Sequence, residues 1–233
     1  MKEKVFRFKQ FSLRQHDRVH KVGTDGVLLG AWVNIKPADQ NILDAGTGTS
    51  LIALMLAQRS KAFITGIEPD PTACALAIEN AANSPFTSRV TISQNRLQDL
   101  HARAQFDLIV INPPFFENQL RSPNEQRNGQ RHNDSLPFHE LIAAVKELLK
   151  ESGRLAVILP IEEGLRFKEL AQKNGFHLSR ITEVHSKASK PPFRLLMELD
   201  LQDVVCEKRV LVLENDHGHR SEAYHRLTEA FYL

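Results

Sequence analysis

The stretch ILDAGTGTS, residues 42–50, indicates a short apolar strand that runs into a glycine-containing turn and then into a helix. Glycine at positions 46 and 48 would let the backbone approach a bound nucleoside closely. The third glycine of a dinucleotide-binding loop is missing, and Asp44 stands before the first glycine. This arrangement favours a ligand that carries an amino group over one that carries a pyrophosphate. We therefore predict that Asp44, Gly46 and Gly48 bind such a ligand.

The rest of the chain predicts an α/β fold around this stretch. From residue 41 onward, apolar runs of strand length alternate with amphipathic helical stretches, which is typical of βαβ units and a parallel sheet. The expected strands cover residues 42–44, 63–68, 90–93, 108–112, 155–159, 176–184, 195–201 and 210–213. The expected helices cover residues 50–58, 71–83, 136–151 and 163–173, and a last helix starts at Ser221. Helix 163–173 should be a crossover, so strand 176–184 should run parallel to its neighbours.

The residues before this core have a pattern of their own. Residues 5–13 alternate between apolar and polar side chains and then change phase, which predicts a bent strand or a hairpin. Thr24 should cap a short apolar helix that ends near Trp32, and Asp70 with Pro71 should begin the helix at 71. We expect one domain, with an N-terminal extension (1–39), a core (40–203) and a C-terminal strand and helix (204–233).

The composition is that of an ordinary globular protein, with 42% hydrophobic and 25% charged residues in a chain of 233. The longest apolar run, residues 51–57, is far below the ~20 residues that a membrane helix requires. The first ten residues lack the apolar region of a signal peptide. Cys74 and Cys206 suit a reducing compartment and have no metal-ligand spacing. We expect a cytoplasmic protein with no metal and no membrane partner.

The net charge is only +2, but the basic residues are unevenly distributed. They concentrate in residues 1–21, in the segment after Phe116, and in residues 185–194. Residues 117–133 form a long polar stretch, which is typical of a lid, a binding loop or disorder. Residues 185–194 carry three cations and no acid: Lys187, Lys190 and Arg194. The distribution favours a polyanionic partner more than the total charge does.

A rigid corner follows the apolar run 107–111. Its sequence is Asn112-Pro113-Pro114-Phe115. Proline fixes φ and supplies no N–H, so the Asn112 side-chain oxygen and the local carbonyl groups are free acceptors, and Phe115 offers a stacking face. Two acceptors beside an aromatic surface would hold a planar amino group. A strand that simply ends at a proline-rich turn explains the tetrapeptide equally well.

Two acidic residues follow other strands of the predicted sheet. Glu68 closes the second strand of the core, where a carboxylate can accept both hydroxyl groups of a ribose, and Asp99 follows the third strand. A solvated strand end is the alternative for Glu68. Ligands of open α/β sheets bind outside the carboxyl ends of the strands, so both side chains should join the glycine turn and Asn112 at one edge.

These residues together resemble the class I S-adenosylmethionine-dependent methyltransferases that methylate amino groups and carry an Asn-Pro-Pro-aromatic motif. The resemblance covers about residues 40–201. Further motifs are similar to the bacterial YfiC family and extend the resemblance over nearly the whole chain: FKQF at 8–11, KVGTDGVLLGAW at 21–32, Arg131-His132 and Lys190-Pro191-Pro192. The fold implied is a Rossmann-like methyltransferase fold with a mostly parallel seven-stranded sheet and helices on both faces.

The resemblance implies methylation of adenine N6 in a valine tRNA, beside the anticodon at position 37, with S-adenosylhomocysteine as the second product. It assigns the cofactor's amino group, ribose and adenine to Asp44, Glu68 and Asp99. Asn112, the Pro113 carbonyl and Phe115 would hold the target base. Lys187, Lys190 and Arg194 would contact phosphates of the tRNA anticodon stem-loop, and a solvated hairpin is the alternative for this segment. We expect a monomer.

The sequence departs from the family pattern at two positions. Ser50 stands where many relatives carry a third glycine, and Phe115 replaces the tyrosine common in adenine and glutamine methylators. Phenylalanine also occurs in ribosomal guanine-N2 methyltransferases, so the target base is less secure than the reaction. A protein glutamine-N5 methyltransferase, a non-catalytic RNA-binding domain and a nicotinamide oxidoreductase are also compatible with parts of the pattern. The missing third glycine argues against the oxidoreductase.

Overall fold

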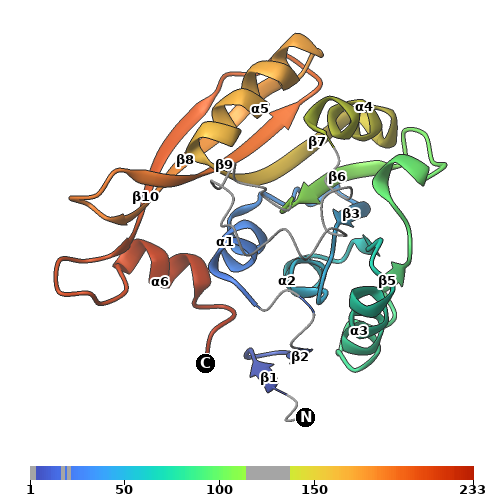
Figure 1. The fold of residues 1–233 in the computed structure, drawn as a ribbon, viewed down its shortest axis with the longest axis horizontal. Coiled ribbons are helices and arrows are strands. Elements are labelled where there is room, and N and C mark those ends of the chain that lie inside the picture. The colour runs from blue at the N-terminus through green and yellow to red at the C-terminus, as the bar shows by residue number, and fades with distance from the viewer. Residues whose placement is uncertain (1–3, 17–18, 20–21, 114–136) are drawn as a thin grey trace, which may run out of the picture.

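The alternating strands and helices form one central sheet in the computed structural model (Figure 1). The structure describes residues 4–16, 19, 22–113 and 137–233. The strands are β1 (Lys4–Arg7), β2 (Ser12–Gln15), β3 (Asn41–Ala45), β4 (Phe63–Ile67), β5 (Val90–Ser93), β6 (Phe106–Ile111), β7 (Leu149–Pro160), β8 (His177–Lys187), β9 (Pro192–Asp200) and β10 (Glu207–Glu214). The helices are α1 (Thr24–Trp32), α2 (Leu51–Arg59), α3 (Pro71–Ala82), the short 3-10 helix η1 (Leu97–Asp99), α4 (Phe138–Leu148), α5 (Ile161–Lys173) and α6 (Glu222–Thr228).

The main sheet has the strand order β10-β8-β9-β7-β6-β3-β4-β5. All neighbouring strands are parallel except for β9, which is antiparallel to both β7 and β8. The prediction of a mostly parallel α/β sheet is therefore confirmed. The sheet has eight strands, because the predicted C-terminal strand, β10, joins the other seven at the edge beside β8.

The prediction for strand 176–184 is right in direction and wrong for one neighbour. α5 is a crossover, and β8 runs in the same direction as β7. However, β9 returns from β8 through a short turn and inserts between β8 and β7, so one neighbour of β8 is antiparallel. A hairpin turn reverses the chain, whereas a parallel neighbour needs another crossover.

The helix predicted over 136–151 is too long at its C-terminal end. α4 ends at Leu148 and the chain passes directly into β7. Gly153 lies where the register between β6 and β7 shifts, and a Cβ there would come within 2.9 Å of the carbonyl oxygens of Lys150 and Phe106. A glycine is therefore needed for β7 to pair with β6 in this way.

Two apolar clusters cover the two faces of the sheet. Alternate residues of β6 divide between them: Leu108 and Val110 face one cluster, and Ile109 and Ile111 face the other. The first cluster includes residues of α1, α2 and α6, and the second includes residues of α4 and α5. Figure 1 shows α4 and α5 on one side of the sheet and α1, α2, α3 and α6 on the other. None of the described helices has the length and apolar character needed to cross a membrane.

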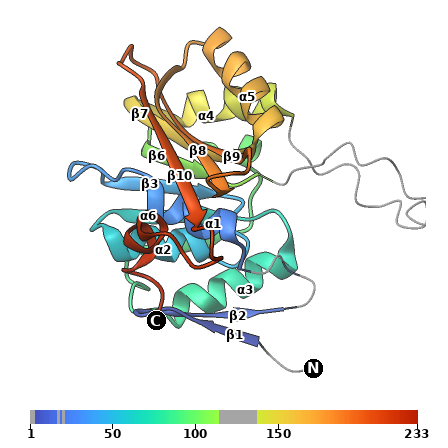
Figure 2. The same ribbon diagram turned by 90° about the vertical axis from the view of Figure 1, so that its left-hand side faces the viewer.

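The N-terminal segment forms the predicted hairpin, in which β1 and β2 are antiparallel. It lies beside α3, on the side of the molecule away from α4 and α5 (Figure 2). Asp70 caps α3 as predicted, because its side chain accepts from the Ala73 N–H at 2.7 Å. The prediction for Thr24 is wrong: Gly23 is the N-cap of α1, and Thr24 is the first residue of the helix.

Candidate active site

The predicted ligand residues meet where the strand order reverses. The chain proceeds from β3 to β4 and β5 on one side and then crosses back to β6 on the other. β3 and β6 are direct neighbours, with Ala45 opposite Ile111. The turn at 46–50 and Asn112 therefore leave the same edge of the sheet from adjacent strands. A reversal of this kind is the usual ligand position in an open α/β sheet.

Asp44 is buried with one oxygen engaged and the other unsatisfied. Its Oδ2 accepts from the Thr47 hydroxyl at 2.6 Å and from the Ala53 N–H at 3.0 Å, whereas its Oδ1 has no hydrogen-bond partner among the described residues. Burial raises the pKa of Asp44 to about 7, the two hydrogen bonds oppose this rise, and the nearby Glu68 carboxylate adds to it. A buried acceptor of this kind favours a positively charged donor.

The turn after β3 leaves open space in front of its glycines. Gly46 and Gly48 have φ values of 73° and 56°, in the left-handed region, and a Cβ built on either would meet no atom within 4 Å. Ser50 is also left-handed at φ 66°, and its hydroxyl donates to the Ala77 carbonyl at 2.9 Å. The departure at Ser50 thus keeps the backbone conformation that glycine favours and adds a hydrogen bond to α3.

Glu68 links the glycine turn to the end of β4. Its Oε2 accepts from the Gly48 N–H at 2.9 Å, and its Oε1 accepts from the Asp70 N–H at 3.1 Å. A carboxylate has about four lone-pair sites, which is more than these two backbone hydrogen bonds occupy. Asp99 lies in η1, after the carboxyl end of β5, with its side chain exposed.

Asn112 presents a second unsatisfied acceptor. Its Oδ1 atom is buried and has no hydrogen-bond partner among the described residues, and Pro113 beside it is buried. An unpaired buried amide oxygen costs free energy, which a ligand with an N–H donor recovers. Phe115 and Pro114 lie outside the described residues, as do the basic residues of the segment after Phe116.

Residues 185–194 form a β-hairpin whose basic side chains differ in environment. Lys187 ends β8 and Lys190 is exposed in the turn, where its N–H donates to the Lys187 carbonyl at 3.0 Å. Arg194 lies in β9 and not in a loop, and its Nε donates to the Asp25 carboxylate at 2.9 Å. The structure therefore separates Arg194, which joins β9 to α1, from the two lysines of the turn.

Three side chains that support this edge were not predicted. Thr47 orients Asp44, Asp25 pairs with Arg194, and Asn80 of α3 hydrogen-bonds to the backbone of Thr49. Of the three, only Asn80 could have been predicted from the sequence, because a polar residue on the buried face of a helix needs hydrogen-bond partners. The other two depend on contacts between distant segments.

The residues present fit S-adenosylmethionine. An unsatisfied carboxylate oxygen suits its ammonium group, the open space before Gly46 and Gly48 admits its bulk, and Glu68 can accept from its ribose. Within the described ranges, no group of three or more His, Cys, Asp or Glu side chains is placed to hold a metal ion.

Comparisons with known proteins show the family to which the chain belongs. The methyltransferase small domain matches residues 22–182. A tRNA1(Val) (adenine(37)-N6)-methyltransferase of Porphyromonas gingivalis is 43% identical, covering 98% of this chain and 94% of the relative. The enzyme of the same name from Dyadobacter fermentans is 39% identical, covering 98% and 97%. The crystal structure of a predicted O-methyltransferase from Agrobacterium tumefaciens shares the fold, with a TM-score of 0.71 at 17% identity over 89% of this chain and 96% of its own. The chain belongs to the methyltransferase small domain family and, within it, to the tRNA1(Val) (adenine(37)-N6)-methyltransferases.

Proposed function

We infer that this protein transfers a methyl group from S-adenosylmethionine to N6 of adenine 37 in tRNA1(Val). The observation that carries this inference is about 40% identity over nearly the full length of enzymes with that name. The unsatisfied Asn112 oxygen at the end of β6 supports it, because an exocyclic amine has N–H donors to offer.

We propose that Asp44 receives the ammonium group of the cofactor, Glu68 its ribose hydroxyls and Asp99 its adenine, while Gly46 and Gly48 allow close approach. When bound, S-adenosylmethionine supplies an electrophilic methyl group on a sulfonium sulfur. The Asp44 carboxylate must be ionised for this role, and the incoming positive charge favours the ionised form.

The chain's part in the transfer is to position the target amine. The lone pair of adenine N6 is delocalised into the ring, which makes the amine a poor nucleophile. Asn112 Oδ1 and the Pro113 carbonyl would accept hydrogen bonds from its two N–H groups and favour a pyramidal nitrogen. The lone pair of this nitrogen would then point at the methyl group to be transferred. The N–H proton leaves to solvent afterwards. Positioning and local dipoles account for this catalysis, so no nucleophilic side chain is required.

We propose that Phe115 stacks on the target base once the base leaves the anticodon-loop stack, which costs a few kcal/mol. Lys187 and Lys190 would contact phosphates of the anticodon stem-loop from the β8–β9 turn. Arg194 contributes less, because its guanidinium already pairs with Asp25. Reversing both lysines to Glu should weaken tRNA binding for all sequences alike and leave cofactor affinity unchanged. Unchanged tRNA affinity would remove the turn from the RNA site.

The proposed reaction is tested with an unmodified tRNA1(Val) transcript, S-adenosylmethionine and mass spectrometry of the digested nucleosides. We expect N6-methyladenosine in the parent transcript and none in a transcript with guanine at position 37. Formation of N2-methylguanosine in the second transcript would favour a guanine-methylating enzyme. We further propose that the chain acts in the cytoplasm as a single-domain monomer, which size-exclusion chromatography with light scattering would check.

A further inference from the structure

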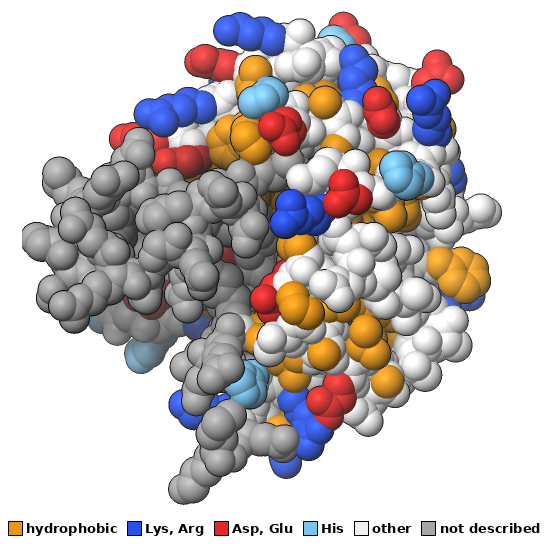
Figure 3. Space-filling view, turned by 45° about the vertical axis from the view of Figure 1, so that its right-hand side comes forward, with side chains coloured by type: hydrophobic (Ala, Val, Ile, Leu, Met, Phe, Trp, Pro, Cys, Tyr) orange, Lys and Arg blue, Asp and Glu red, His pale blue; other side chains and the backbone are white. Residues whose placement is uncertain are grey.

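The N-terminal hairpin carries cations and no acid. Residues 4–16 include Lys4, Arg7, Lys9 and Arg14 but neither Asp nor Glu. Lys4 and Arg7 are exposed, and among the described residues neither side chain has a hydrogen-bond or ion-pair partner. By contrast, basic and acidic side chains are intermixed on the face turned forward in Figure 3. Arg14 pairs with Glu79 of α3, so the positive charge that the hairpin leaves unpaired is that of Lys4 and Arg7.

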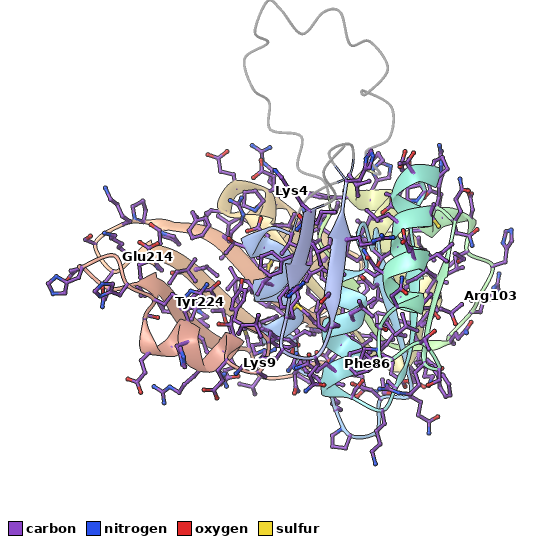
Figure 4. All side chains as sticks on the ribbon, turned by 90° about the horizontal axis from the view of Figure 1, so that it is seen from below. Lys4, Lys9, Phe86, Arg103, Glu214 and Tyr224 are labelled. Carbon is purple, nitrogen blue, oxygen red and sulfur yellow. The ribbon has the colours of Figure 1, made fainter. Side chains whose placement is uncertain are left out.

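The closed end of the hairpin is fixed to the C-terminus of the chain. The Lys9 N–H donates to the Phe231 carbonyl at 2.8 Å, and its Nζ donates to the Glu229 carbonyl at 2.7 Å. Phe8 stacks on Tyr232, with ring centroids 5.9 Å apart. Lys9 is thus used in holding the hairpin, whereas Lys4 lies at the opposite end (Figure 4).

The open end of the hairpin is fixed to the cofactor turn by Asn80. The Asn80 Oδ1 accepts from the Arg14 N–H at 2.8 Å, and its Nδ2 donates to the carbonyls of Arg14 at 3.1 Å and Thr49 at 3.0 Å. Asn80 is 1% exposed, so these bonds are shielded from water. Arg14 lies opposite Val5 and next to the Lys4–Gln15 pair. One buried side chain therefore sets the open end of the hairpin against the residue that follows Gly48.

We propose that the β1–β2 hairpin binds backbone phosphates of the RNA substrate through two exposed cations, Lys4 at its open end and Arg7 at the last strand pair before its closed end, and that Asn80 is the positioning residue for the open end. The inference rests on the proposed function. Phosphate contacts fix the register of a nucleic acid on a protein, and a surface held in place beforehand loses less entropy when it binds. Lys4 meets both requirements next to the turn at residues 46–50, and Arg7 extends the basic surface along β1.

The test compares two double charge reversals with tRNA1(Val) as substrate. Lys4→Glu/Arg7→Glu changes the proposed surface, and Lys36→Glu/Lys61→Glu makes the same change of charge at exposed lysines near the amino ends of β3 and β4. We expect the first variant to raise KM for tRNA at least tenfold, keep kcat at saturating tRNA within twofold, and leave S-adenosylhomocysteine affinity unchanged. The slope of log K against log salt should fall by about one unit per lost contact. The control variant should match the parent.

Parental KM and salt slope in the first variant, or equal effects in both variants, would overturn the inference while the proposed function stands. A loss of cofactor affinity in the first variant would also overturn it, because the hairpin would then support the fold. If the charge-reversal variant does not fold, the neutral variant Lys4→Gln/Arg7→Gln takes its place in the same measurements. If the parent methylates no tRNA, the proposed function fails, and fluorescence anisotropy with an anticodon stem-loop still measures the hairpin's contribution.

The positioning role of Asn80 has a test of its own. Asn80→Ala should raise KM for tRNA in the parent but change it less than twofold when Lys4 alone is already reversed to Glu, because both changes then act on one interaction. Equal increases of KM in the two backgrounds would show that Asn80 only supports the fold and would overturn this role.

Discussion

The two edges of the main sheet differ in how their charged and polar side chains are paired. At the amino edge, charged side chains are paired within the chain: Arg154 with Asp39 at 2.7 Å, Arg180 with Glu198 at 2.8 Å and Lys150 with Asp107 at 2.7 Å. At the carboxyl edge, Asp44 and Asn112 each keep a buried oxygen without a partner among the described residues. Folding pairs each of these charges at the first edge with one of opposite sign, whereas the second edge leaves two acceptor oxygens that we propose ligands engage.

At the amino edge, each buried guanidinium group binds a carboxylate. Both terminal nitrogens of the Arg154 guanidinium donate to the Asp39 carboxylate, and one also donates to the Asn34 carbonyl. The Nε atoms of Arg154 and Arg180 are buried and have no partner among the described residues. The terminal nitrogens of each guanidinium nevertheless bind a carboxylate. The Asp107 carboxyl is partly buried, which raises its pKa, but hydrogen bonds from Lys150 and two backbone N–H groups outweigh burial and hold the pKa below its usual range.

The largest effect is expected at Asn112. Asn112→Ala removes the acceptor proposed for the target amine, and the alanine methyl group offers nothing to replace its oxygen. We expect methyl transfer to fall by about 10²- to 10³-fold or more, which is the loss typical of removing one preorganised polar group from an active site. Calorimetry should find S-adenosylhomocysteine affinity within about twofold of the parent. A variant that methylates tRNA at the parental rate would contradict the proposed role of the carboxyl edge.

The opposite edge should respond in stability and not in chemistry. Asp39→Ala leaves the buried Arg154 guanidinium without its carboxylate, which should cost about 3–5 kcal/mol in the free energy of unfolding. The exposed pair Arg166–Glu162 provides the control, because Glu162→Ala should cost less than about 0.5 kcal/mol. Urea denaturation measures both, and activity per folded molecule should stay near the parental value. A loss of kcat in folded Asp39→Ala would show that the two edges are not independent.

Asp44 should make cofactor binding depend on pH. Its pKa of about 7 in the free protein means that the ionised form, which suits the cationic cofactor, becomes dominant only above that pH. Cofactor affinity should therefore rise about tenfold between pH 6 and pH 8. Asp44→Asn should flatten this rise and lower affinity at pH 8 by about 10- to 100-fold, because the amide would place an N–H donor or a neutral oxygen where a carboxylate is needed. A pH profile that the substitution leaves unchanged would contradict the assignment.

The same carboxyl affects the stability of the unliganded protein. Its pKa in the unfolded chain is about 3.9, so between about pH 4 and pH 7 the folded state holds a proton that the unfolded state has lost. The contribution of Asp44 to stability is therefore present below about pH 4 and is lost as the pH rises through 7. Thermal unfolding of the parent and Asp44→Asn over this range should diverge in slope, with the variant less dependent on pH.

The features of this structure that depend on neighbouring residues are the ones that the sequence predicts. The glycine turn, the cap at Asp70 and the hairpin at the N-terminus follow from neighbouring residues, and the structure confirms them. The edge of the sheet where Asp44 and Asn112 meet also follows, because the carboxyl ends of parallel strands must lie together.

Contacts between distant segments do not follow from local pattern. Arg154 and Asp39 are 115 residues apart, and nothing in either neighbourhood indicates the other. The insertion of β9 between β7 and β8 depends on which edge the hairpin joins, and local pattern leaves that open. The sequence groups Arg194 with the lysines of its segment, but strand pairing turns it toward Asp25 of α1. Charge runs in the sequence therefore indicate where cations lie along the chain and not what they bind.

The smallest effect is expected at Ser50, an uncharged residue of the turn at the carboxyl edge. Its left-handed backbone costs a non-glycine residue about 1–2 kcal/mol, and its buried hydroxyl recovers about 0.5–1.5 kcal/mol through the Ala77 carbonyl. Ser50→Gly relieves the strain and loses the hydrogen bond, so stability and cofactor affinity should each change by less than about 1 kcal/mol. Ser50→Val keeps the strain, adds a branched side chain and loses the bond, so it should destabilise the turn and weaken S-adenosylhomocysteine binding. Thermal unfolding with and without S-adenosylhomocysteine separates the two outcomes. Equal loss of affinity in both variants would mean that the hydroxyl itself, and not the backbone conformation, shapes the cofactor turn.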